Sequence, residues 1–260
     1  MKTLLEEAGS SPRAIGATLL RLLEKNELLQ EQEHEMRAIH NLCRNVDTRR
    51  KNMVLLDLVR SSADKVIVFV KYQATLQYLS DFLNWEGVPH AVFHGGLTSA
   101  QKEDHIRRFE SDIPLLIATE VSGEGRNLQF CHRMINYDLP WNPMKIEQRI
   151  GRLHRIGQTR EVFIFNFAVK GTIEDYLIEL LDQKINMFEM VIGEIEPILG
   201  HLDTEEDFEN VVLDIWMRSR NEQDLQAGFA DFGNSLLKAK SRYLQSKQFD
   251  EEIFGEDYEI

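Results

Sequence analysis

The sequence is poor in the residues that mark exported, disulfide-bonded or membrane proteins. It has 2 cysteines and 6 prolines in 260 residues, and no uninterrupted apolar stretch of about 18 residues, the length that crosses a bilayer. Cys43 and Cys131 lie far apart and outside any CxxC or histidine spacing, which argues against a disulfide framework and a zinc site. The first residues carry acids where a signal peptide would be apolar. These absences favour a soluble chain in the reducing cytoplasm.

Negative charge is concentrated towards the C-terminus. The net charge is -13, and residues 171–260 hold 22 acidic against 7 basic side chains. Residues 1–60 hold 9 against 10, and residues 61–170 hold 12 against 13. Within residues 141–160, five basic side chains are opposed by Glu147 alone. A local basic cluster of this kind can bind a polyanion even in an acidic chain.

Short apolar runs alternate with helical patterns between residues 65 and 169. The run 65–70 (KVIVFV) is typical of a strand, and apolar residues then recur at helical spacing up to Gly87. Further strands are expected at 90–94, 114–119, 132–138 and 161–169, and further helices at 98–110 and 143–154. This alternation predicts an α/β fold with a mainly parallel sheet, covered on both faces, whose ligands bind at the carboxyl ends of the strands.

Both flanks of this block are expected to be helical. Residues 1–60 show helical periodicity without a convincing strand, and the last sixty residues alternate acidic stretches with short helical patterns. We therefore expect three parts. They are a helical lead-in at 1–60, an α/β lobe at 61–195 and an acidic, mainly helical extension at 196–260.

Glycine-rich loops follow two of the expected strands. After 114–119, Gly123 and Gly125 allow the backbone to approach a ligand closely, next to the hydroxyls of Thr119 and Ser122. Taken alone, such a Gly-x-Gly is more often only a turn. After 90–94, a Gly-Gly pair precedes the start of a helix, where it either offers N–H groups to phosphate or simply leads into the helix cap.

The segment EQRIGRLHRIGQ (147–158) places three arginines three residues apart, so that they stay near one helix face. Gly151 lies inside this helix at a cost of about 1 kcal/mol relative to alanine, which suggests close approach of a backbone or a ligand. An ordinary solvated surface, with Glu147 as a partner, is the alternative interpretation.

Two segments resemble motifs five and six of superfamily two helicases. They are LLIATEVSGEGRNLQF (115–130) and INYDLPWNPMKIEQRIGRLHRIGQ (135–158). The form is that of Swi/Snf DNA translocases, and it is most similar to bacterial members such as the RNA polymerase recycling ATPase. The likeness extends from about Ser10 to about Ile192, and the HRIGQ ending is highly specific.

The resemblance implies a RecA-like, three-layer lobe whose partner lobe binds ATP and magnesium. Arg152 and Arg155 match the arginine fingers that reach the γ-phosphate, and Gln148 matches the glutamine that opens this motif. Nucleotide contacts are implied for Gly123, Gly125 and Asn127. Contacts to the DNA backbone are implied for Lys71, His94, Gly95, Gly96, Thr119 and Ser122.

The family's phosphate loop is not in this sequence. There is no G-x-x-x-x-G-K-[ST] and no Gly-Lys pair, and the only Asp-Glu pair, at Asp250, follows motif six without a preceding apolar strand. We therefore expect one of the two lobes of an ATPase motor, either cut from a longer protein or a natural fragment. This chain alone should be inactive, because ATP and magnesium are held by the N-terminal lobe.

The expected function is that of the C-terminal motor lobe of an ATP-dependent double-stranded DNA translocase or remodelling helicase. The expected partners are the N-terminal lobe of the same parent chain, the backbone of DNA, and a protein complex to be displaced. The alternative is a nucleic-acid or protein interaction module that uses the same fold without hydrolysis. A strand-separating RNA helicase shares these motifs but fits the WNP and HRIGQ segments less well.

Overall fold

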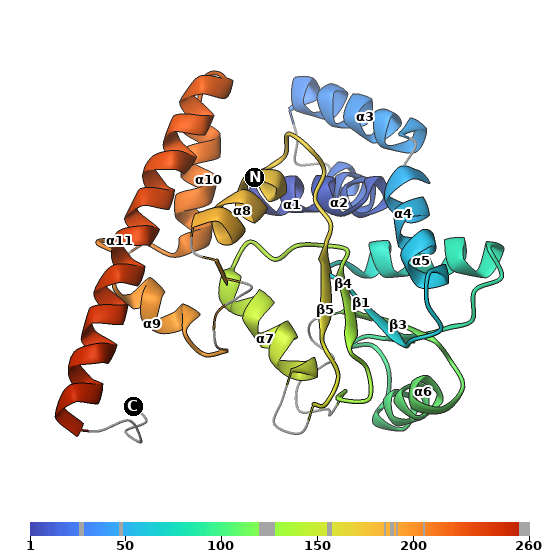
Figure 1. Ribbon diagram of the computed structural model, residues 1–260. Coiled ribbons are helices and arrows are strands. Elements are labelled where there is room, and N and C mark those ends of the chain that lie inside the picture. Colours follow the sequence, from blue (N-terminus) through green and yellow to red (C-terminus); the bar gives the residue numbers. More distant parts are fainter. Residues whose placement is uncertain are drawn as a thin grey trace. The chain divides into compact units, whose positions relative to one another are not determined.

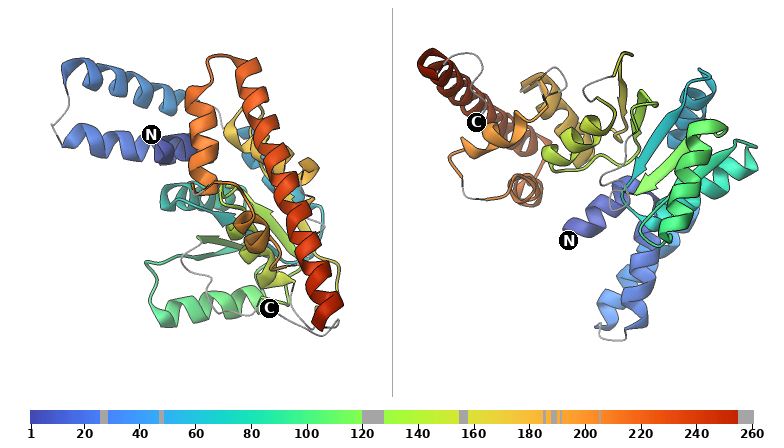
Figure 2. Two further views of the ribbon diagram at one scale, coloured as in Figure 1. Left: turned by 90° about the vertical axis from the view of Figure 1, so that its left-hand side faces the viewer. Right: turned by 90° about the horizontal axis from the view of Figure 1, so that it is seen from below.

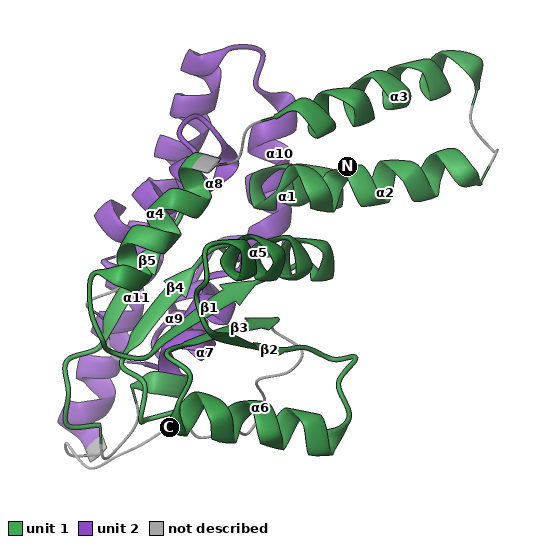
Figure 3. Ribbon diagram, turned by 90° about the vertical axis from the view of Figure 1, so that its right-hand side faces the viewer, with its two compact units in different colours: residues 1–139, 152–168 green, residues 140–151, 169–260 purple. Residues whose placement is uncertain are grey.

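An α/β unit and a helical unit make up the chain (Figure 3). The first comprises residues 1–139 and 152–168, and the second comprises residues 140–151 and 169–260. The computed structural model describes residues 1–25, 29–46, 49–119, 128–154, 158–184, 186, 187, 190, 192–204 and 206–254. No helix among these residues is both long and apolar enough to span a bilayer.

A parallel sheet forms the centre of the first unit (Figure 1). Its described strands follow the order β2-β3-β1-β4-β5, and every neighbouring pair is parallel. The bounds are β1 Val66–Val70, β2 His90–Phe93, β3 Leu115–Thr119, β4 Arg133–Asn136 and β5 Phe163–Asn166. The expected α/β class with a mainly parallel sheet and helical flanks is confirmed.

Helices cover the central strands because those strands are apolar on both faces. Every residue of β1 and β3 is buried, as expected of parallel strands inside an α/β sheet. One face of β1 packs against α4 (Arg49–Arg60) and α5 (Gln73–Trp85), and α6 (Ser99–Ser111) lies beside β2. The side chains of this core include Leu55, Leu56, Val66, Val68, Val70, Leu76, Leu79, Leu83, Leu115, Ile117 and Ile135.

The N-terminal helices of the first unit are α1 (Lys2–Ser10), α2 (Pro12–Glu24) and α3 (Gln30–Asn45). Ser11 begins α2 as its N-cap, because its hydroxyl accepts the Ala14 N–H at 3.1 Å while Pro12 occupies the first turn. In Figure 2, α2 and α3 run side by side as a helical hairpin that extends away from the sheet. Helix α1 instead ends close to the sheet, where Ser10 contacts Thr75 and Asp138.

The second unit is helical. It contains most of α7 (Pro143–Leu153), and then α8 (Ile173–Glu179), the π-helix η2 (Leu180–Lys184), α9 (Ile195–Gly200), α10 (Phe208–Arg218) and α11 (Glu222–Phe254). Aromatic rings hold these helices together. Tyr176 stacks on Phe229 at a centroid distance of 4.9 Å, and Phe208 meets Phe232 at 5.2 Å.

Helix α11 is one long helix of 33 residues, whereas its sequence suggests only short helical patterns. Glycines inside it explain the difference. A Cβ atom at Gly228 would lie 2.8 Å from a methyl carbon of Ile215 on α10, so glycine permits a close approach between the two helices that local propensity does not reveal.

Candidate functional site

The carboxyl ends of three neighbouring strands form the candidate site in the first unit. In the sheet register, Val70 lies opposite Thr119, and Phe93 lies opposite Ala118. His94 therefore leaves β2 at the level where Thr119 ends β3, and Lys71 leaves β1 one residue further on. Three residues expected to contact nucleic acid thus lie along one edge of the sheet, where ligands of parallel α/β folds bind.

Lys71 is held at both its main chain and its side chain. Its backbone N–H donates to Oδ2 of Asp138 at 2.7 Å, just beyond the end of β4. Its ammonium nitrogen Nζ lies 2.6 Å from Oε1 of Glu6 on α1, and the Lys71 side chain remains 29% exposed. The ammonium is therefore partly accessible to solvent but already has an anionic neighbour.

His94, Gly95 and Gly96 form a turn that leads into α6. The Gly96 N–H donates to Nδ1 of His94 at 3.2 Å, so the ring proton belongs on Nε2. Burial lowers the pKa of His94, and His105 and Lys102 lower it further. The ring is consequently neutral at pH 7 and can contact a phosphate as a hydrogen-bond donor. A Cβ at Gly96 would lie 3.2 Å from this ring, which explains the glycine.

Helix α7 carries the other described residues of the predicted set. Gln148 is exposed and Arg152 is half-buried, whereas Arg149 is only 3% exposed. The neighbour of Gly151 is the side chain of Ile192, 3.6 Å from the position of a Cβ, so an ordinary side-chain contact accompanies this glycine. Oε1 of Glu147 accepts the N–H of Gly193 at 2.9 Å.

Several expected site residues lie outside the described residues. They are Ser122, Gly123, Gly125, Asn127 and Arg155. The expected nucleotide contacts, those of Gln148 and Arg152 included, therefore all stay predictions. Among the residues that are described, no three His, Cys, Asp or Glu side chains are grouped as a metal site requires.

The candidate site lies within a segment that matches a known family. Residues 50–157 match the helicase conserved C-terminal domain. The chain contains a helicase C-terminal domain. The expected resemblance to helicases is thereby confirmed, and the carboxyl edge described above belongs to this domain.

Two relatives of this chain come from bacteria. The uncharacterized ATP-dependent helicase YqhH of Bacillus subtilis (strain 168) is 41% identical over 226 residues, which are 86% of this chain and 40% of YqhH. The RNA polymerase-associated protein RapA of Vibrio atlanticus (strain LGP32) is 32% identical over 176 residues, which are 66% of this chain and 18% of RapA. The chain thus spans less than half the length of either relative.

A solved structure, the C-terminal part of the Fun30 ATPase domain, is also similar to this chain. It superposes with a TM-score of 0.48 at 23% sequence identity. The superposition covers 65% of this chain and 55% of that one.

The first unit also contains site neighbours that the sequence does not reveal. Glu6 and Asp138 contact Lys71, and the Gln73 side chain lies 3.4 Å from Nδ1 of His94. Glu6 is 65 positions from Lys71 and Asp138 is 67. Gln73 could have been suggested by its place one turn after β1, but the sequence has no motif that links Glu6 to this edge.

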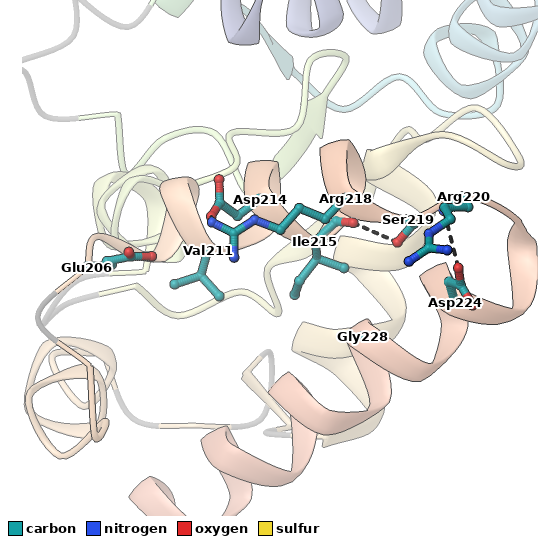
Figure 4. Close-up of a pocket in the computed structure, with 9 residues that line it drawn as sticks. All are labelled: Glu206, Val211, Asp214, Ile215, Arg218, Ser219, Arg220, Asp224 and Gly228. Carbon is teal, nitrogen blue, oxygen red and sulfur yellow. Dashed lines mark hydrogen bonds and ion pairs between the residues drawn. The ribbon is translucent and has the colours of Figure 1, made fainter.

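A separate hollow lies between α10 and α11 in the second unit (Figure 4). Its volume is about 420 Å³, and none of the predicted site residues lines it. Arg218 pairs with Asp214 across one turn of α10, and Asp224 accepts the Arg220 N–H at 3.3 Å. Since these charged groups contact one another, the hollow is a weaker candidate than the carboxyl edge of the sheet.

Proposed function

We propose that this chain is the C-terminal motor lobe of an ATP-dependent double-stranded DNA translocase or remodelling helicase of the Swi/Snf type. The supporting observation is the alignment of Lys71, the His94–Gly96 turn and Thr119 along one edge of a helicase C-terminal domain. A cation, a solvent-exposed glycine turn and a threonine at the same level of the sheet suit a row of phosphates. Because phosphates carry no base identity, the binding is independent of sequence and sensitive to salt.

ATP enters this proposal as a substrate shared with an N-terminal lobe. That lobe holds the nucleotide phosphates and magnesium, and Arg152 approaches the γ-phosphate from α7. A planar, permanently charged guanidinium suits the charge that develops on phosphoryl oxygens during transfer. Arg155 and Gln148 belong to the same proposed catalytic set, with Gly123, Gly125 and Asn127 next to the nucleotide.

The proposed partners follow from the same arrangement. They are the N-terminal lobe and the backbone of duplex DNA. RapA is named for its association with RNA polymerase, and by analogy we include a nucleic-acid-bound protein complex that the motor displaces. This chain alone is expected not to hydrolyse ATP, because its sequence contains no phosphate loop.

Replacement of Arg152 in an ATPase that contains both proposed lobes tests the catalytic part of the proposal. Arg152→Ala is expected to lower the DNA-stimulated ATPase rate by roughly a thousandfold, the scale on which arginine fingers act. Nucleotide affinity should change far less, because the finger acts mainly as the phosphate leaves. Arg152→Lys should rescue the rate poorly, since lysine keeps the charge and loses the planar fork.

Arg149, on the same helix, provides the matched control. Arg149 is buried whereas Arg152 is half-buried, so Arg149→Ala should lower the melting temperature of the 260-residue chain clearly more than Arg152→Ala does. A large loss of stability from Arg152→Ala in this chain would assign Arg152 to the fold and remove the support for its catalytic role.

A further inference from the structure

Helix α1 places a carboxylate directly on the cation of the proposed DNA site. Glu6 is only 7% exposed, and its Oε1 lies 2.6 Å from the Lys71 ammonium. Its other oxygen, Oε2, accepts the Tyr72 hydroxyl at 3.3 Å. Burial raises the pKa of Tyr72, with Glu6 and Glu7 adding to the rise, so the phenol stays protonated and remains a donor. The Glu6 carboxylate thus has a cation and a hydroxyl as partners.

The adjacent carboxylate of α1 is turned to a different partner. Oε1 of Glu7 accepts the Thr18 hydroxyl of α2 at 2.7 Å. Glu7 is also buried and carries the same formal charge, but Glu6 makes the ion pair with Lys71. The two neighbouring residues therefore separate the effect of an ion pair from the effect of a buried carboxylate in general.

The base of Lys71 is fixed while its ammonium can reorient. Asp138 accepts the Lys71 backbone N–H at 2.7 Å and the Ser10 hydroxyl at 2.8 Å, which joins the end of α1 to the loop after β1. The lysine stem is flexible and its ammonium has three donors. A phosphate that approaches Lys71 therefore meets a charge that Glu6 has largely neutralised, and it gains little until the ammonium turns away from α1.

We propose that Glu6 sets the affinity of the nucleic-acid site, as an internal carboxylate that a DNA phosphate has to displace from Lys71. This inference rests on the proposed DNA contact of Lys71. Displacement leaves the buried Glu6 without its cation, which weakens the docking of α1 on the sheet edge. By linkage, DNA binding loosens α1, and firm docking of α1 weakens DNA binding.

A double-mutant cycle in the 260-residue chain tests the inference. The proteins are the wild type, Glu6→Gln, Lys71→Gln and the double variant, and the probe is a fluorescein-labelled DNA duplex of mixed sequence, titrated by anisotropy at several salt concentrations. Glu6→Gln is expected to tighten binding roughly two- to fivefold, the range for a partly exposed ion pair. It should also steepen the logarithmic salt dependence by about one counterion. Lys71→Gln should weaken binding and make that dependence shallower by about one.

Measurements in the Lys71→Gln variant distinguish the proposed Lys71 contact with DNA from the proposed role of Glu6. Glu6→Gln should have no effect there, because the cation for which it competes is gone. Unchanged binding by Lys71→Gln would overturn the Lys71 contact of the proposed function itself. If Lys71→Gln weakens binding but Glu6→Gln leaves it unchanged or weaker, the role of Glu6 alone is wrong. Glu7→Gln is the matched control and should change binding far less than Glu6→Gln, because the Glu7 carboxylate is hydrogen-bonded to Thr18 while Glu6 makes the close ion pair with Lys71.

Hydrogen exchange of α1 provides a second measurement that does not require Glu6 to be replaced. Saturating DNA should reduce the protection of the amides of α1 in the wild type and not in Lys71→Gln. Unchanged or increased protection in the wild type would overturn the competition. If circular dichroism shows that Glu6→Gln does not fold, Glu6→Asp replaces it. This variant keeps the charge on a side chain that is one methylene shorter, and it should tighten binding to a smaller extent.

Discussion

The two edges of the sheet hold charge in different ways. At the carboxyl edge, Asp138 and Glu6 have side chains no more than 7% exposed, and their partners include Lys51 and Lys71. At the amino edge, Asp64 pairs with Arg160 at 2.9 Å, and both side chains are more than 30% exposed. The same kinds of residue therefore work in a low dielectric at one edge and largely in water at the other.

This contrast indicates which edge can respond to a ligand. An exposed ion pair loses little when one partner leaves, because water replaces that partner. A buried carboxylate that loses its partner becomes an uncompensated charge. Ligand binding at the carboxyl edge can therefore be coupled to movement of the helices that supply its carboxylates, whereas the amino edge can vary its pairs without that consequence.

The largest expected difference between the edges is in stability. Asp138→Ala should lower the free energy of unfolding by about 3 kcal/mol, because the Lys71 N–H and the Ser10 hydroxyl lose their acceptor and Lys51 loses its counter-ion. Asp64→Ala should have a much smaller effect, since the Asp64 side chain is 34% exposed and solvent can replace its partners. Urea denaturation of the two variants measures both values. Equal losses at the two edges would contradict the contrast.

A smaller effect is expected from Glu7, and it depends on pH. Burial raises the pKa of Glu7 above its ordinary value of 4.5, so in the window above that value the folded chain binds a proton that the unfolded chain has released. Stability from this group is therefore gained as pH falls towards 4.5 and lost as pH rises through the raised pKa. Glu7→Gln should remove this dependence, which urea denaturation from pH 7 down to the ordinary value can measure. A constant difference between variant and wild type across the window would show that the folded structure does not perturb Glu7.

The smallest effect is expected at Asp64, with the opposite sign. The Ser62 hydroxyl, followed by Arg160, lowers the pKa of Asp64 from 3.8 to about 2. As pH falls from 3.8 towards 2, the unfolded chain protonates Asp64 before the folded chain does. The stability contributed by Asp64 is therefore present above its ordinary pKa and is lost as pH falls towards 2. Asp64→Asn should unfold with a weaker dependence on pH there, as measured by urea denaturation between pH 5 and 2.5. Identical slopes for variant and wild type would place Asp64 outside this network.

Much of the fold follows from local patterns along the chain. The apolar runs at 65–70 and 114–119 coincide with β1 and β3, and the helical spacing after Gln73 coincides with α5. These elements are readable because period-two and period-3.6 patterns record which face of each segment is buried. Helix α11 is harder to predict from the sequence, because its internal glycines Gly228 and Gly233 reflect the proximity of α10 and η2 instead of the helix's own propensity.

In the candidate site, too, some features could be predicted from the sequence and others could not. The resemblance to helicase motifs allowed Lys71, the His94–Gly96 turn and Thr119 to be named from the sequence, and their common edge was expected because parallel strands end together. The partner of each side chain could not be named in the same way. Arg149 and Arg152 have the same chemistry and lie three residues apart, yet one is buried and the other half-buried.

Local pattern therefore establishes the α/β class, the strand ends and the motif residues of the helicase domain, because each depends on residues within a few turns of one another. Folding alone brings Glu6 of α1 to Lys71 and joins Ser10 to Asp138, across 65 and 128 positions of the chain. No local periodicity encodes such pairs. They arise because the docking of α1 on the sheet edge buries charged groups, which are stable in a low dielectric only when they are paired.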